Sequence, residues 1–256
     1  MRKEYVIISE KSMGHKLSNV VIKNYEDRCT LSKTIDISYD MLNDNIIQAV
    51  KKQDEFIEEI ITKYHSLELG YYGIAHTPLV FRAGYQVGDQ DNVHLYHKCR
   101  SNDSEFIEWS EELGLFKINI ESCDEPKEYI HEKQEMIVAI GTSFEIKKSE
   151  ITKLNPENKH LMFFKANIID FDNIKSYKDA EQARKFIWNN VRNYVKKYNI
   201  QKIHLLIASS VAFTFFLGMG YSRQHDPECV VYHYERPDYK WGINIKKGSD
   251  ECFVEL

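Results

Sequence analysis

Short apolar runs alternate along the chain with longer stretches in which apolar residues recur at helical spacing. Residues 203–208 and 229–234 are apolar runs rich in β-branched or aromatic side chains, which is typical of strands buried on both faces of a sheet. Between them, residues 211–218 predict a short apolar helix that begins directly after the polar pair Ser209-Ser210. This order of strand, polar corner, helix and strand is half of a nucleotide-binding α/β unit.

The same order of elements occurs earlier in the chain, so we interpret the sequence as an internal duplication. In each half, a strand and a long amphipathic helix precede the polar corner. The strands are residues 5–9 and 136–143, and the helices are residues 43–64 and 180–198. Short apolar strands can also resemble one another by chance, but the shared order favours duplication. The aligned pairs are Ile74-Ala75 with Ile207-Ala208, His76-Thr77 with Ser209-Ser210, Gly84 with Gly218 after one inserted residue, Tyr96-His97 with Tyr232-His233, and Arg100 with Arg236.

The fold class that we predict is α/β, with two fused Rossmann-like halves related by a pseudo-two-fold duplication. Residues 1–100 form the N-terminal half and residues 136–256 the C-terminal half. The acid-rich segment 101–135 connects them through a short helix and strand, and Trp109 and Phe116 are expected to anchor it in the core. Two minor strands are also expected, residues 34–39 in an accessory hairpin and residues 161–167 at a sheet edge.

Candidate binding residues in the first half follow the strand ends, because ligands of doubly wound sheets bind at the carboxyl edge. Ser9, Lys11 and Ser12 follow the first strand. Lys11 can neutralise a phosphate there, or it can be an ordinary lysine of a solvated turn. His76 and Thr77 form the next corner, with Thr77 as the expected N-cap of a helix whose N–H groups attract anions. We interpret His76 as lining the ligand site.

The second half offers the corresponding candidates. Thr142 and Ser143 lie in a loop of small residues that lets a ligand come close, and Phe144 beside them can stack on a base or belong to the core. Ser209 and Ser210 form the second anion-binding corner.

Aromatic and charged residues elsewhere complete the candidate set. Tyr234 and Trp241 are expected to stack on bases. Arg82 is the single charge on an otherwise apolar helix, and we interpret it as a salt-bridge or subunit-contact residue.

Composition narrows the choice of partners. The chain has 256 residues, of which 43% are hydrophobic, and no apolar run or N-terminal signal that would direct it to a membrane, so we expect a cytoplasmic protein. A formal net charge of −5 argues against binding to long duplex nucleic acid, which favours a basic face. The five cysteines are widely spaced and are expected to be free thiols.

The sequence contains no recognisable catalytic or cofactor-binding motif. Phosphate-loop, dinucleotide, zinc-protease and nucleophile-elbow patterns are missing, and the ten histidines lack metal-ligand spacing. We therefore assign no catalytic residue, metal or cofactor.

The stretches IVAIGTSFEI, IHLLIASSVAFTFFLG, CVVYHYE and YKWGINI resemble the SAVED domain, a fusion of two CARF-like units found in anti-phage CBASS systems and CRISPR-linked effectors. The resemblance implies that the two halves are CARF-like and hold a cyclic oligonucleotide messenger between them. Cyclic tri- or tetranucleotides of the oligoadenylate type are the implied ligands. Ligand-driven head-to-tail self-association is implied too, as is activation of an effector that can be separately encoded.

Two classes of function remain open at this point. A binding module would sense the messenger, or as a sponge would merely sequester it. A metal-independent ring nuclease would cleave the messenger in the same groove, by attack of a ribose 2′-OH on the adjacent phosphate. The sequence favours the sensor, because it contains no recognisable catalytic motif.

Overall fold

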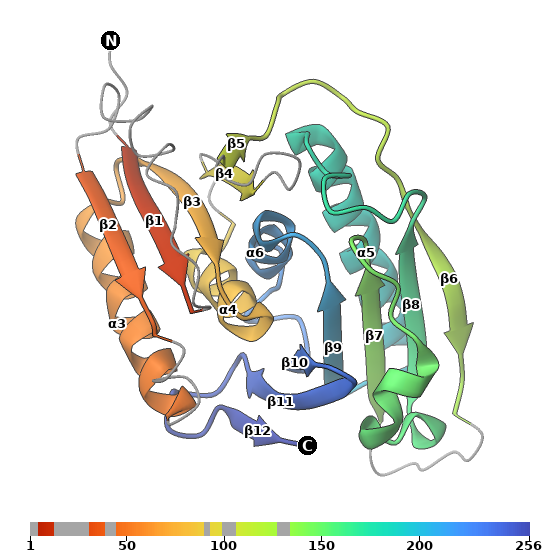
Figure 1. Cartoon of the computed structure of the whole chain (residues 1–256). Coiled ribbons are helices and arrows are strands. Elements are labelled where there is room, and N and C mark those ends of the chain that lie inside the picture. The colour runs from red at the N-terminus through yellow and green to blue at the C-terminus, as the bar shows by residue number, and fades with distance from the viewer. Residues whose placement is uncertain (1–4, 13–30, 39–44, 90–92, 99–105, 127–133) are drawn as a thin grey trace.

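Two β-sheets and the helices between and beside them form the structure, a computed structural model that describes residues 5–12, 31–38, 45–89, 93–98, 106–126 and 134–256 (Figure 1). The first sheet has the strand order β2-β1-β3-β4-β5, with β1 to β4 parallel and β5 antiparallel to β4. Its strands are β1 (Tyr5–Lys11), β2 (Leu31–Asp36), β3 (Glu68–Ile74), β4 (Val93–Lys98) and β5 (Phe106–Glu108).

The second sheet has the order β12-β11-β10-β9-β7-β8-β6, with a parallel centre and antiparallel strands at both ends. Two short 3-10 helices, η1 (Lys148–Leu154) and η2 (Pro156–Asn158), precede β8. The strands are β6 (Ile118–Asp124), β7 (Glu135–Gly141), β8 (His160–Ala166), β9 (Lys202–Ala208), β10 (Glu228–Glu235), β11 (Asp238–Asn244) and β12 (Phe253–Glu255).

The strand order of the first sheet recurs inside the second. The run β8-β7-β9-β10-β11 repeats β2-β1-β3-β4-β5, and in both runs the last strand is antiparallel to its neighbour. The helices agree as well, since His76 caps one corner helix and Ser210 the other, each eight residues before Gly84 or Gly218. The predicted pairing of His76-Thr77 with Ser209-Ser210 was therefore wrong by one position, and no inserted residue is needed before Gly84 and Gly218. His76 corresponds to Ser210.

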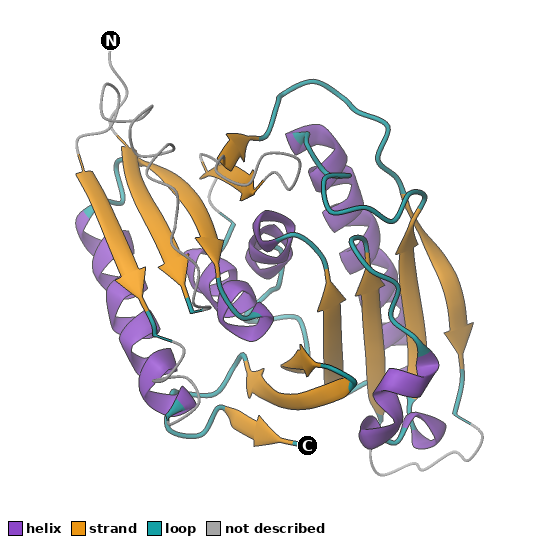
Figure 2. Ribbon diagram, viewed as in Figure 1, coloured by secondary structure: helices purple, strands orange, loops and turns teal. Residues whose placement is uncertain are grey.

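Four α-helices of the described residues lie against the sheets, and their sequences explain where they begin. They are α3 (Ile46–Lys63), α4 (Thr77–Val87), α5 (Tyr177–Tyr198) and α6 (Val211–Met219). Asn45 starts α3 by accepting a hydrogen bond from the Gln48 N–H, and Ser176 does the same for α5. Figure 2 shows α4 and α6 between the two sheets, where both are almost completely buried.

The two halves are locked together where α4 crosses α6. A Cβ atom added to Gly84 would lie 2.0 Å from the Phe215 carbonyl oxygen, and one added to Gly218 would lie 2.1 Å from the Phe81 carbonyl oxygen. These contacts are equivalent in the repeated topology, so each helix contributes one glycine to the close approach. Each helix also packs against the other half's sheet, α4 on β10 and β11, and α6 on β3 and β4.

Arg82 joins the halves by polar contacts. Its side chain is 6% exposed and forms a bidentate pair with Asp54, at 2.7 Å for both nitrogens. The remaining guanidinium nitrogen donates to the carbonyl oxygens of Asn244, Ile245 and Lys247 in the second half. The predicted salt-bridge role of Arg82 is confirmed.

Some predicted elements differ from the structure. The strand expected at residues 34–39 is β2, a parallel strand beside β1, and the other strand of the expected hairpin lies outside the described residues. The strand expected at a sheet edge is β8, which lies between β7 and β6. The connecting segment contributes β5 to one sheet and β6 to the other, its described part contains no helix, and both Trp109 and Phe116 are buried as expected.

Membrane-spanning helices and metal-binding clusters are both missing from the part of the chain that the structure describes. No helix in that part of the chain is both long and apolar enough to span a membrane. No group of three His, Cys, Asp or Glu side chains among those residues is arranged to hold a metal ion.

Candidate functional site

One polar corner forms where β1 and β3 end and α4 begins. Ser12 is fully buried, and its N–H donates to the Ile74 carbonyl at the end of β3. The Ser12 hydroxyl lies 2.6 Å from Nδ1 of His76 and accepts a hydrogen bond from the His76 N–H at 2.8 Å. Ser12 therefore fixes both the backbone and the ring of His76 at the first position of the corner.

The His76 ring reaches the other half of the molecule. Its centroid lies 4.6 Å from that of His233 on β10 and 5.9 Å from that of Trp241 on β11. His233 and Trp241 face each other across the β10–β11 ladder, with centroids 5.0 Å apart. We call Ser12, His76, His233 and Trp241 the mixed corner, because each half supplies two of its members.

The two histidines of the mixed corner are neutral at physiological pH. Burial, together with the neighbouring His233, lowers the pKa of His76 to about 3, and burial lowers the pKa of His233 to about 4. A neutral imidazole donates one hydrogen bond and accepts another, and its face stacks on other rings. The mixed corner thus suits a nucleobase, with its flat ring and polar edge, better than a phosphate.

The second corner is built from hydroxyl groups at the ends of β7 and β9. The Thr142 and Ser143 N–H groups both donate to the Ala208 carbonyl, and the Thr142 hydroxyl lies 2.7 Å from that of Ser209. Ser210 caps α6 by accepting a hydrogen bond from the Phe213 N–H at 3.3 Å. We call Thr142, Ser143, Ser209 and Ser210 the hydroxyl corner.

The hydroxyl corner has the donors that an anion requires. Half-buried hydroxyls of Ser209 and Ser210 stand at the start of an apolar helix, where N–H groups and the helix dipole favour negative charge. Phe144 stands at the rim, 55% exposed, with its ring edge-on to Phe171 at 4.5 Å. The interpretation of Phe144 as a core residue is therefore wrong, and its ring is open to a ligand.

The remaining candidates lie apart from these groups. Ser9 is buried within β1, 1% exposed, and lies outside both corners. Tyr234 is exposed and donates to Glu150 and to the Pro237 carbonyl. Thr77 is the first residue of α4 and not its N-cap, which is His76, because Thr77 already has helical geometry. Lys11 ends β1 and is half-buried.

Two residues near the corners were not predicted from the sequence. His233 is the cross-strand partner of Trp241, so the register of the β10–β11 pair would have identified it from the Trp241 candidate. Asn173 donates its amide to the Thr142 carbonyl at 2.8 Å and so steadies the hydroxyl corner. Asn173 lies in a loop far along the chain, so no sequence pattern links it to Thr142.

One family model matches most of the chain. The family model of SAVED, described as the SMODS-associated and fused to various effectors sensor domain, matches residues 35–245. No curated protein matches the chain.

Solved structures with a similar fold include receptors of Acinetobacter baumannii. The Cap4 SAVED/CARF-domain containing receptor with the cyclic trinucleotide 2′3′3′-cAAA aligns with a TM-score of 0.64 and 15% identity, over 96% of this chain and 52% of that one. The same receptor with 3′3′3′-cAAA gives 0.60 and 15%, over 98% and 52%. At this identity the likeness is one of fold, and the chain spans about half the length of these receptors.

Proposed function

This chain belongs to the SAVED family of sensor domains, and from that premise we propose that it binds a cyclic oligonucleotide messenger between its two halves. Cyclic trinucleotides of adenine are the ligands of the similar Acinetobacter baumannii receptor, and we propose a cyclic tri- or tetranucleotide of that type here. No further cofactor enters the proposal.

The mixed corner is the observation that carries this proposal. His76 from the first half stands 4.6 Å from His233 of the second half, so a ligand held there contacts both halves at once. Such a ligand reports on their relative position, which is what a sensor requires.

Different roles follow for the two corners. We assign base recognition to His76, His233 and Trp241, through stacking and through the neutral imidazole edges. We assign phosphate binding to Ser209 and Ser210 at the start of α6. Phe144 extends the hydroxyl corner as a stacking surface.

Binding without turnover is favoured over messenger cleavage. A general base works best when its pKa is near the working pH, and His76 and His233 have pKa values of about 3 and 4. These imidazoles are therefore too weakly basic to remove a proton from a ribose 2′-OH efficiently.

We also propose that the bound messenger drives head-to-tail self-association and thereby activates an anti-phage effector.

A thermal-shift panel of cyclic di-, tri- and tetranucleotides tests the proposal first. A ligand that binds only the folded state raises the melting temperature, and the stabilisation grows with the logarithm of the ligand's excess over Kd. We expect a cyclic trinucleotide to stabilise the wild-type protein and to be recovered intact by chromatography after incubation. Recovery of linear fragments would instead identify a ring nuclease, and no stabilisation by any ring would overturn the proposal.

Variants of the corners locate the ligand. Ser209→Glu places a negative charge at the proposed phosphate site, and Trp241→Leu removes a stacking surface worth about 1–3 kcal/mol. In calorimetry, Trp241→Leu should weaken binding by about 5- to 150-fold and Ser209→Glu by at least about tenfold, while Ser149→Glu on the exposed face of η1 should bind like the wild type. Light scattering with and without ligand then tests self-association, and an unchanged mass would remove assembly from the proposal.

A further inference from the structure

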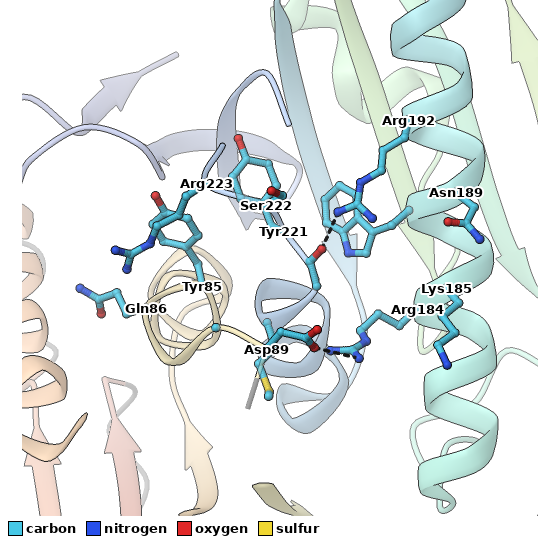
Figure 3. A pocket seen from close by; sticks show the side chains of 14 residues that line it. Tyr85, Gln86, Asp89, Arg184, Lys185, Asn189, Arg192, Tyr221, Ser222 and Arg223 are labelled. Carbon is cyan, nitrogen blue, oxygen red and sulfur yellow. Dashed lines mark hydrogen bonds and ion pairs between the residues drawn. The ribbon is translucent and has the colours of Figure 1, made fainter. Parts of the chain in front are cut away.

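A cavity lies at the other ends of α4 and α6, away from both corners. It has a volume of about 560 Å³, within the range of pockets that hold small ligands. Tyr85 and Asp89 line it from the end of α4, and Arg223 lines it from the turn after α6. Figure 3 shows Arg184 and Arg192 reaching from α5 toward these helix ends. The carboxyl-edge corners share no residue with this cavity.

Cations dominate the cavity wall, and aromatic rings hold them in place. Four positively charged side chains line the cavity against a single carboxylate, Asp89. The Arg184 guanidinium lies 4.0 Å from the Phe216 ring centroid, and that of Arg223 lies 4.8 Å from the Tyr85 ring centroid. A guanidinium stacked on a ring keeps its N–H edge available for an acceptor. The cations are Arg184, Lys185, Arg192 and Arg223.

Two of these arginines differ in how their charge is balanced. Arg192 has a strong partner, because two of its nitrogens each donate to Asp226 at 2.8 Å. The Arg184 side chain is only 12% exposed, yet its carboxylate Asp89 is 3.5 Å away and 84% exposed. Arg184 is therefore buried almost as deeply as a core side chain while its charge is only weakly compensated.

Arg184 also has an unused donor. Its Nη1 atom is buried and has no hydrogen-bond partner among the described residues. Burial lowers the pKa of this guanidinium, which is the sign of a charge that lacks sufficient compensation. Nearly all buried polar groups in proteins are hydrogen-bonded, so an orphaned guanidinium nitrogen at a cavity wall indicates an acceptor that enters from the cavity.

We propose that this cavity is a second binding site, specific for a phosphorylated small molecule of nucleotide size. Phosphate oxygens accept strong, charge-assisted hydrogen bonds from a guanidinium group. They therefore supply the acceptor that the Nη1 atom of Arg184 lacks. The cavity is too large for a phosphate ion alone and leaves room for an organic group beside Tyr85 and Arg223. The site does not depend on the messenger-binding function proposed above.

The cavity lies between the two halves of the chain. Its walls come from the end of α4 in one half and from α5 and the α6 turn in the other. A ligand there contacts the far ends of α4 and α6, whose N-caps, His76 and Ser210, belong to the mixed and hydroxyl corners.

Calorimetry with ATP and with tripolyphosphate tests the site on the full chain at low salt. We expect saturable ATP binding that Arg184→Gln weakens at least about tenfold, the effect of losing one charge-assisted hydrogen bond. Arg223→Gln, at an exposed position, should weaken it several-fold without affecting folding. Lys196→Gln removes an exposed charge from the same helix outside the cavity and should leave binding unchanged.

The comparison of ATP with tripolyphosphate shows which part of the ligand the cavity recognises. Tighter binding of ATP than of tripolyphosphate supports a nucleotide as the ligand, and equal binding supports recognition of the phosphate chain. The proposal fails if neither probe binds at millimolar concentration, or if Lys196→Gln weakens binding as much as both cavity variants do. If a cyclic trinucleotide competes with ATP and loses affinity in Arg184→Gln, the anion site stands, and the assignment of the messenger to the two corners is overturned.

Discussion

Glu10 is a buried carboxyl group that forms no ion pair with any described residue. It is completely inaccessible on β1 and faces α3 and α4, where the Tyr71 hydroxyl donates to it at 2.7 Å and the Gln53 amide forms a second hydrogen bond. Burial raises the pKa of Glu10 to about 7, although both hydrogen bonds act in the opposite direction. The group is thus protonated in the folded protein under mildly acidic conditions, where the unfolded chain is already ionised.

Replacing Glu10 with Gln should change how stability depends on pH. A raised folded-state pKa gives stability that is complete below about pH 4.5 and is lost as pH rises to about 7 and slightly beyond. We expect Glu10→Gln to be more stable than the wild type at pH 8, by about 1–3 kcal/mol, and to lack this decline. Urea denaturation between pH 5 and 8 measures it, with Glu58→Gln on the exposed side of α3 as control. A parallel decline in Glu10→Gln and wild type would contradict the assignment.

Individual side chains were predictable where sequence neighbours decide their environment. Ser210 begins a helix because a hydroxyl precedes an apolar run, and the sequence contains that information. The neutral state of His76 was not predictable, since it arises from His233 and from burial by a different half of the chain. Phe144 was ambiguous for a related reason, because its exposure depends on where Phe171 lies.

At the scale of elements, the crossing of α4 and α6 rests on two glycines. Gly84→Ala and Gly218→Ala each force a methyl group into a backbone carbonyl of the opposite helix, at 2.0 and 2.1 Å. Side-chain rotation cannot relieve a backbone clash, so we expect each variant to lose about 2–3 kcal/mol of unfolding free energy. Gly248→Ala meets nothing within 4 Å and should be close to neutral. Equal stability of all three variants in urea denaturation would show that the helices separate easily.

Elements were predicted well where one face or a continuous apolar run determines them, as for β9, α3 and α5. The details that failed depend on partners distant in sequence. On α5, Phe186 is 39% exposed, while Trp188 is buried and donates to the Leu217 carbonyl of α6. The position of β8 inside its sheet depends on β6, which comes from the connecting segment.

At the scale of the whole molecule, Arg82 supports the joint between the halves. Arg82→Met leaves Asp54 without its cation and three carbonyl oxygens without their donor. We expect a loss of about 2–4 kcal/mol, toward the lower side of the cost of breaking a buried ion pair because Asp54 is partly exposed. Lys63→Met breaks an exposed pair with Glu59 and should cost less than about 0.5 kcal/mol. Similar midpoints for both variants in urea would contradict this role.

The unequal corners of the repeated topology have a consequence for ligand shape. A homodimer presents the same side chains twice, because rotation copies every residue. Here both units share one chain, and the equivalent helix caps are an imidazole at His76 and a hydroxyl at Ser210. A ring of three nucleotides has no two-fold axis and cannot match two identical seats. A receptor with dissimilar seats can hold such an odd-membered ring in a single orientation and treat each of its nucleotides differently.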